Sequence, residues 1–126
     1  ISFSNFNEVA DYINLSGSRL TDKTLSTIES MRDTYGPLYC RHACGICESR
    51  CSAGVPVNTI MRYNNYFIAQ SREKFAMSQY LRLPRPNAGN CAGCEGFCEA
   101  ACPYGVPIHA LLVDAHRNLS LTGEYA

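Results

Sequence analysis

The distribution of cysteine constrains this chain more than any other feature, because all eight cysteines fall into two short runs. The first run reads C-x3-C-x2-C-x3-C and consists of Cys40, Cys44, Cys47 and Cys51. The second reads C-x2-C-x3-C-x3-C and consists of Cys91, Cys94, Cys98 and Cys102, with Pro103 directly after it. Each run offers four thiolates in a short stretch of chain, which favours binding of a compact metal centre.

Cysteine runs that end in Cys-Pro are typical of proteins that bind [4Fe–4S] clusters, and in these proteins the fourth cysteine of a run ligates the other cluster. We therefore predict two [4Fe–4S] clusters as cofactors and one-electron transfer as the function. The crossed arrangement places one cluster on Cys40, Cys44, Cys47 and Cys102. It places the other on Cys91, Cys94, Cys98 and Cys51. Ligation of each cluster within a single run remains the alternative arrangement.

Two zinc sites with four cysteines each are the main alternative cofactors, and they would make the chain a metal-stabilised structural or interaction module. Structural zinc sites usually join paired C-x2–4-C elements across a longer spacer, whereas each run here holds four cysteines. Disulfides are less favoured, because 8 cysteines in 126 residues is a lower content than in small secreted disulfide scaffolds. Metal-bound thiolates imply a reducing compartment, so we predict that the chain is cytoplasmic.

The two runs belong to a longer internal repeat. An offset of 51 residues carries Cys40 onto Cys91 and two further cysteines of the first run onto the second. The same offset carries the Gly-Val-Pro-Val sequence of residues 54–57 onto the Gly-Val-Pro-Ile sequence of residues 105–108. Only the second cysteine of each run breaks the register. The repeat predicts a duplicated unit, which consists of a cysteine loop and the helix after it.

The N-terminal part contains no cysteine and reads as a short strand followed by two helices. Residues 1–5 alternate apolar and polar side chains like the end of a strand. Asn5 or Asn7 then caps a first helix, and Thr21 caps a second one that ends at Gly36. The apolar stripe of this second helix consists of Leu25, Ile28 and Met31.

The part with the cysteines is predicted to be all-helical. Pro56 and Pro107 each start a helix directly after a cysteine run, and a further helix lies between them. No strand pairs are evident in residues 37–119. We therefore predict an all-α fold with two pseudo-repeated units of cysteine loop and helix, preceded by the strand and helix segment of residues 1–36. Residues 120–126 form a tail.

Charge and hydropathy exclude two kinds of partner. Basic and acidic residues balance at 11 each, without a basic cluster, so nothing directs the chain to nucleic acid. No stretch is long and apolar enough to predict a membrane span. The first residue is isoleucine rather than methionine, so we expect a fragment or a processed product.

The chain resembles the C-terminal iron–sulfur domain of a subset of aldo/keto reductases, an α-helical ferredoxin. The resemblance covers roughly residues 37–119. The matching residues are Cys44-Gly45-Ile46-Cys47, the stretch from Cys51 to Val57, Met61-Arg62-Tyr63-Asn64, and the second run continued through Ile108. Residues 1–35 bear a weaker resemblance to the last barrel strand of such a reductase and the helices behind it. The sequence departs from the pattern at Ser52, where a proline is usual, and in the longer gap between Cys40 and Cys44.

This resemblance implies an electron-transfer domain of a larger oxidoreductase. Its partner would be a reductase barrel in the same polypeptide, with a further redox protein outside. No residue of this chain matches the catalytic tetrad of those reductases, so we assign no catalytic residue and expect the chain alone to be non-catalytic.

The remaining polar residues near the cysteines receive structural interpretations. His42 is expected to lie near the centre or in solvent rather than to bind metal, and His109 and His116 are expected at the surface or at helix ends. Arg41 and Arg50 flank the first run, and Glu48 offsets them in part. The only charged side chains in the second run are acidic, those of Glu95 and Glu99. Because cations favour reduction of a nearby cluster, we predict that the cluster of the first run has the higher potential.

Overall fold

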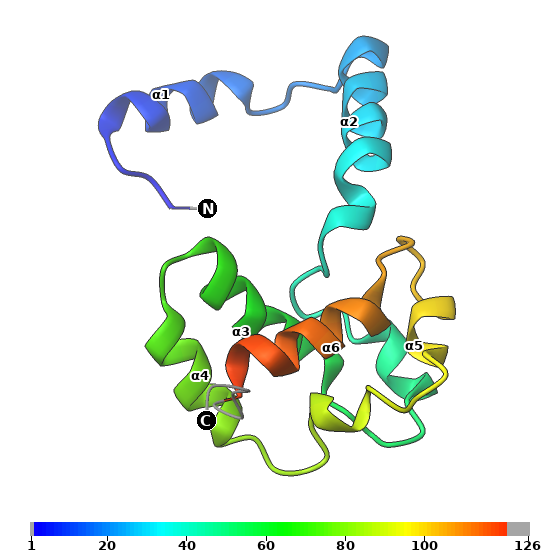
Figure 1. Ribbon diagram of the computed structural model, residues 1–126. Helices are drawn as coiled ribbons and strands as arrows, with labels where there is room; N and C mark the ends of the chain where they lie inside the picture. The colour runs from blue at the N-terminus through cyan, green and yellow to red at the C-terminus, as the bar shows by residue number, and fades with distance from the viewer. Residues whose placement is uncertain (1, 121–126) are drawn as a thin grey trace. The chain divides into compact units, whose positions relative to one another are not determined.

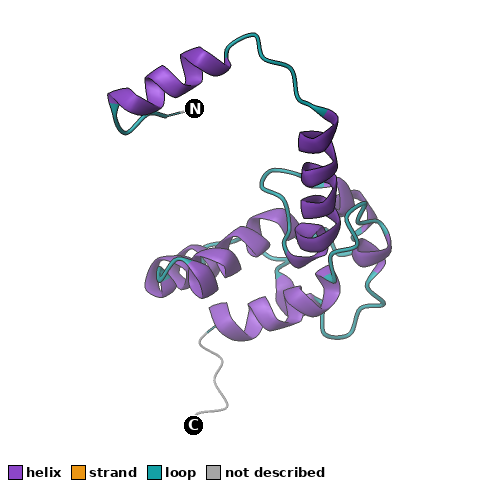
Figure 2. Ribbon diagram, turned by 90° about the horizontal axis from the view of Figure 1, so that it is seen from above, coloured by secondary structure: helices purple, strands orange, loops and turns teal. Residues whose placement is uncertain are grey.

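The computed structural model describes residues 2–120, and in this part of the chain every regular element is a helix (Figure 2). The prediction of an all-α fold is therefore confirmed. The chain divides into two compact units, Ile1–Asp33 and Thr34–Ala126. The division lies slightly before the boundary expected at residue 36, and residues 121–126 of the predicted tail lie outside the described residues.

The first unit contains α1 (Phe6–Leu15) and most of α2 (Asp22–Tyr35). Asn5 caps α1 by accepting from the backbone N–H of Glu8 at 3.0 Å. Thr21 caps α2 through a 3.2 Å bond from the N–H of Thr24. Both caps were predicted, because their signals are local in the sequence.

The strand expected at residues 1–5 is wrong for the described positions 2–5, which contain no strand. A strand needs a neighbour to satisfy its backbone groups, and the described residues provide none. Asn5 is extended, with a φ of −156°, because it caps α1.

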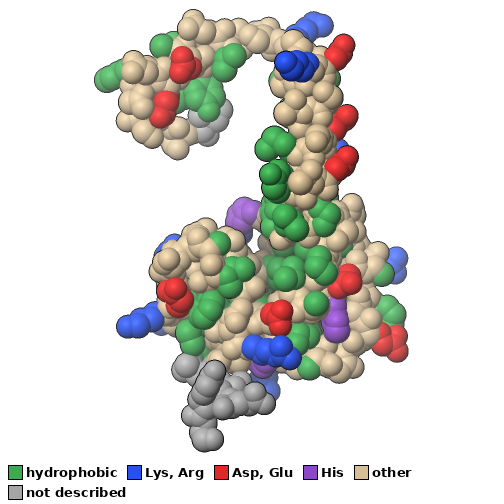
Figure 3. All heavy atoms as spheres, turned by 45° about the horizontal axis from the view of Figure 1, so that its top comes forward, with side chains coloured by type: hydrophobic (Ala, Val, Ile, Leu, Met, Phe, Trp, Pro, Cys, Tyr) green, Lys and Arg blue, Asp and Glu red, His purple; other side chains and the backbone are tan. Residues whose placement is uncertain are grey.

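The helices of the first unit bury none of their described side chains. On α2 the hydrophobic side chains lie along one side of the helix and the acidic ones along the other (Figure 3). The predicted stripe is present, and its members Leu25, Ile28 and Met31 are 44%, 43% and 56% exposed.

The second unit is built on three helices, α3 (Val57–Ala69), α4 (Glu73–Leu81) and α6 (Ile108–Leu119), each of which packs against the other two (Figure 1). Their largest fully buried side chains are those of Tyr80, Ile60, Ile108, Leu112 and Leu119. Full burial of an aliphatic side chain of this size stabilises the fold by about 1.5–3 kcal/mol. The three helices therefore form the core that supports the cysteine loops.

Four short helices carry the loops, namely the 3-10 helices η1 (Gly36–Leu38), η2 (Ile46–Arg50) and η3 (Ala88–Asn90) and the α-helix α5 (Phe97–Ala100). α5, drawn in yellow, packs against η2 (Figure 1). Since η2 contains Cys47 and α5 contains Cys98, this contact brings the two cysteine runs together.

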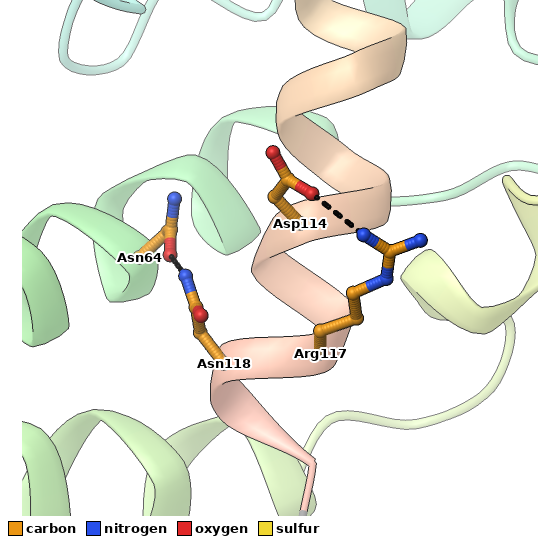
Figure 4. Close-up of polar contacts among 4 residues, drawn as sticks. All are labelled: Asn64, Asp114, Arg117 and Asn118. Carbon is orange, nitrogen blue, oxygen red and sulfur yellow. Dashed lines mark hydrogen bonds and ion pairs between the residues drawn. The ribbon is translucent and has the colours of Figure 1, made fainter.

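A polar contact joins α3 to α6 away from the cysteines. Asn118 donates from its side chain to Oδ1 of Asn64 at 3.1 Å (Figure 4). Asn64 is only 4% exposed, so this bond satisfies a polar group in the core. The ion pair of Asp114 and Arg117 lies on the exposed side of α6 (Figure 4) and contributes little to stability.

The backbone hydrogen bonds after each run follow the 51-residue offset of the sequence. Val57 N donates to Val55 O at 2.8 Å, and Ile108 N donates to Val106 O at 2.7 Å. Gly54 and Gly105 both have a positive φ, of 67° and 65°. Glycine adopts this conformation without steric cost, which explains its presence at both equivalent turns.

None of the helices in residues 2–120 combines the length and the apolar character that a membrane span requires.

Candidate metal centre: two sets of cysteines

The structure brings cysteines of both runs together around one pocket. Cys40, Cys44 and Cys47 of the first run line this pocket together with Cys102 of the second. Asn58, at the start of α3, and Tyr104, just after the second run, complete its wall. We call these four cysteines the first set.

The other four cysteines, Cys51, Cys91, Cys94 and Cys98, form the second set, which likewise draws on both runs. Burial, together with the nearby Cys98, Cys51 and Cys94, raises the pKa of Cys91 to about 11. Burial also raises the pKa of Cys98, with Cys51 as the next cause. Thiolates act on each other in this way only when they lie close together. Cys51 is therefore near the second run.

The two sets are neighbours. Burial raises the pKa of Cys47 to about 11, and the next cause is Cys98 of the second set, ahead of Cys40 and Cys102 of its own set. Burial raises the pKa of Cys40 as well; a hydrogen bond from Asn58 opposes this effect, and Cys44 and Cys102 add to it. Cys47 and Cys98 lie where η2 packs against α5.

Among residues 2–120, three N–H groups donate to cysteine sulfurs. The backbone N–H of Val55 donates to Cys51 Sγ at 3.3 Å, and that of Gly96 donates to Cys94 Sγ at 3.4 Å. The side chain of Asn58 donates to Cys40 Sγ at 3.5 Å. Gly96 has a φ of 77°, and a Cβ added to it would lie 3.1 Å from the side chain of His109. Both its backbone conformation and its surroundings therefore favour glycine.

Asn58 fixes the loop that carries the first run. Its Nδ2 also donates to the carbonyl of Arg41 at 2.6 Å, and its Oδ1 accepts from the N–H of Ala43 at 2.9 Å. Ala43 needs this support, because its φ of 56° lies in the left-handed region, which costs a residue with a Cβ about 1–2 kcal/mol. Ala43 stands in the gap before Cys44, which is one residue longer than the matching gap of the second run.

His109 performs the matching task for the second run. Its Nε2 lies 2.8 Å from the carbonyl oxygen of Cys91, and the 51-residue offset carries Asn58 onto His109. The backbone N–H groups of the same two residues donate to carboxylates, Asn58 to Glu48 at 2.8 Å and His109 to Glu99 at 3.1 Å. Each carboxylate thereby accepts from a free amide at a helix N-terminus, and its negative charge interacts favourably with the positive end of the helix dipole.

Arg41 connects the loop of the first run to the end of the second. Its guanidinium carbon lies 3.7 Å from the centre of the Tyr104 ring and 4.8 Å from that of Tyr39. A cation over an aromatic face contributes about 0.5–2 kcal/mol. Arg41 therefore holds a positive charge beside the first set.

Two histidines lie at the two ends of α6, as expected. His109 and His116 are both partly buried, and both take part in hydrogen bonds. His116 Nδ1 is 2.6 Å from the hydroxyl of Tyr80, whose pKa is raised by burial. His42 is exposed and contacts Arg62, and it lines no part of the pocket of the first set.

The structure also changes how the charges divide between the sets. Arg50 lies beside α5, where it lines a shallow depression with Phe97 and Ala101, so it belongs to the second set as much as to the first. Glu48 and Glu99 occupy equivalent positions, so their charges affect the two sets alike and add nothing to the difference between them. The predicted difference in charge therefore rests on Arg41 and Glu95.

Sequence reasoning missed Asn58, Arg62 and the roles of the two glutamates. The internal repeat contained a signal for some of them, because the offset that pairs the cysteines also pairs Glu48 with Glu99 and Asn58 with His109. Nothing in the sequence indicated that Asn58 would reach Cys40, eighteen residues away.

All eight cysteines are free thiols. In the described residues, no group of three or more His, Cys, Asp or Glu side chains is arranged to hold a single metal ion. Compared with protein-family models, with curated proteins and with solved structures, the chain matches none of them.

Proposed function

We propose that this chain transfers single electrons through two [4Fe–4S] clusters and is the electron-transfer part of a larger oxidoreductase. The observation that carries the proposal is the grouping of the cysteines. Cys40, Cys44 and Cys47 of the first run line one pocket with Cys102, and Cys51 of the first run lies near Cys91 and Cys98 of the second. These groupings support the two ligand sets of the crossed arrangement.

The surroundings of the sulfurs fit such clusters. A bound [4Fe–4S] cluster supplies one-electron chemistry, and N–H donors to its sulfurs tune its potential. The chain provides such donors on Cys40, Cys51 and Cys94. The buried position of Cys47, Cys91 and Cys98, each at most 8% exposed, keeps water away from the sulfur atoms.

The closeness of Cys47 and Cys98 supports transfer between the two centres. Cys47 belongs to the first set and Cys98 to the second, and Cys98 is the strongest thiol influence on Cys47. An electron that enters at one centre would therefore have a short route to the other. By its resemblance to the iron–sulfur domain of aldo/keto reductases, the chain would exchange electrons with a reductase barrel and an outside redox protein in a reducing compartment, the cytoplasm.

A reductive titration tests the proposed function. Anaerobically purified protein is expected to be brown and to lose its broad visible absorption on addition of dithionite, with electron paramagnetic resonance signals from the reduced clusters. A colourless protein that binds zinc and takes up no electrons would contradict electron transfer and leave the structural zinc module.

Substitution of the fourth cysteines tests the crossed arrangement. Under crossing, Cys51→Ser removes a ligand from the cluster of Cys91, Cys94 and Cys98, whereas Cys102→Ser damages the cluster of the first run. Cys102→Ser is therefore expected to lose the same cluster as Cys44→Ser. Cys51→Ser is expected to lose the other cluster. The opposite pairing of spectra would show ligation within each run.

A further inference from the structure

A cavity of about 470 Å³ lies in the second unit beside Cys40. Its walls come from residues 38–40 and 42, from α3 and Gln70 directly after it, and from one residue of α6. The apolar part of the wall consists of Leu38, Tyr39, Met61, Tyr66, Ile68 and Leu111. Cavities of about 300–1,000 Å³ with mostly apolar walls and a few polar groups are typical binding sites for small organic molecules.

Arg62 gives this cavity a positive charge without a counter-ion. Its Nε is buried and has no hydrogen-bond partner. The one ion pair among residues 2–120 joins Arg117 to Asp114, so no described carboxylate neutralises Arg62. A buried donor without a partner costs about 1–3 kcal/mol, and more when the group is charged.

His42 does not supply the missing negative charge. The guanidinium of Arg62 contacts the imidazole, with its terminal nitrogen 2.8 Å from Nε2. The same nitrogen also contacts Nδ1 of the ring, and an imidazole carries no negative charge in either of its usual states. Nε itself has no exposed surface, so an acceptor from outside the chain would reach Arg62 through the part of its guanidinium that lines the cavity.

We propose that this cavity binds a small organic molecule with a carboxylate group and an apolar body. The carboxylate would accept from Arg62, whose planar guanidinium matches a carboxylate in shape and charge. The apolar body would lie between Tyr66 of α3 and Leu38 of the preceding segment. Charge complementarity selects an anion, and the apolar wall selects against small inorganic anions.

The position beside Cys40 gives the ligand a consequence that rests on the proposed function. A carboxylate next to the first set adds negative charge near its cluster and opposes reduction. Bound ligand would then lower the potential of that cluster and leave the other less affected. Binding itself does not depend on the cofactor, so the two claims are tested by separate measurements.

Calorimetric titration of the full chain with 2-naphthoate tests the binding site. The neutral 2-naphthamide is the matched probe, and Arg85→Gln, at an exposed arginine outside the cavity, is the matched variant for Arg62→Gln. We expect 2-naphthoate to bind the parent and Arg85→Gln equally, and to bind Arg62→Gln at least about ten-fold more weakly, since charged hydrogen bonds are lost. The parent should bind 2-naphthamide about ten-fold more weakly as well.

Three results would overturn the site: no binding of 2-naphthoate at millimolar concentration, equal binding of the two probes, or equal binding by parent and a folded Arg62→Gln. The comparison of probes on the parent remains decisive when the variant does not fold. Redox titration of loaded protein with and without 2-naphthoate tests the second claim; binding without a shift in either potential contradicts the electronic coupling and leaves the binding site intact.

Discussion

The side-chain amide of Asn58 donates to the sulfur of Cys40 at 3.5 Å, although eighteen residues of chain separate them. The same side chain bonds to the backbone of Arg41 and Ala43. Asn58 thus couples the first turn of α3 to the loop of the first cysteine run, and a single residue sets both the shape of this loop and the polarity around one sulfur.

Replacement of Asn58 by alanine is expected to lower the potential of the cluster of the first set by tens of millivolts. The reason is that an N–H donor to sulfur stabilises the reduced, more negative state. Potentiometric titration followed by electron paramagnetic resonance measures both clusters separately. Asn118→Ala is the control, because it breaks a polar contact between α3 and α6 away from the cysteines. Equal potentials in parent and Asn58→Ala would remove this role of Asn58.

Ala43→Gly is expected to stabilise the loaded protein by about 1 kcal/mol, since glycine adopts the left-handed conformation without the cost of a Cβ. The mirror experiment is Gly54→Ala at a φ of 67°, where a Cβ would meet nothing within 4 Å, so only backbone strain acts. Thermal unfolding followed by circular dichroism at a fixed scan rate should show a rise of several degrees for the first variant and a fall for the second. A fall for Ala43→Gly would show that the loop does not carry this strain.

Glu95→Gln is expected to raise the potential of the second cluster by tens of millivolts. A carboxylate near a cluster opposes the addition of an electron, and solvent and salt reduce this effect at an exposed position. Glu99 is a poorer choice, because its carboxylate binds the N-terminus of α6. Glu73→Gln, on α4, provides the control. An unchanged lower potential in Glu95→Gln would show that charge does not set the order of reduction.

Removal of the metal is expected to unfold most of the second unit. In the crossed arrangement each cluster joins the two halves of this unit, so metal binding energy becomes folding energy. Chelation under anaerobic conditions should therefore abolish most of the helical circular dichroism, and reconstitution should restore it. Retention of the full helical signal after complete removal of iron would show that the core of α3, α4 and α6 folds alone.

The sequence was sufficient for local features and insufficient for contacts over distance. The caps Asn5 and Thr21 were found because cap and helix adjoin in the chain. The strand predicted at the N-terminus is absent from the described positions 2–5, because alternation alone does not supply the neighbouring strand that pairing requires.

The polar residues around the cysteines show the same limit. Arg62 contacts His42 across twenty residues, and His116 reaches Tyr80 across thirty-six. Such pairs depend on how the helices pack, and no local pattern specifies them. The cysteines themselves could be selected from the sequence, because a repeated spacing with glycine and proline at the same offset is informative without the fold.

Analysis of iron, zinc and acid-labile sulfide in anaerobically purified protein tests the central claim most directly. Two [4Fe–4S] clusters on the sets of Cys40 and Cys91 require about eight iron atoms and about eight sulfide ions per chain, and this is the result we predict. About two zinc ions per chain without sulfide would contradict the account, because two four-thiolate zinc sites would then use the same cysteines.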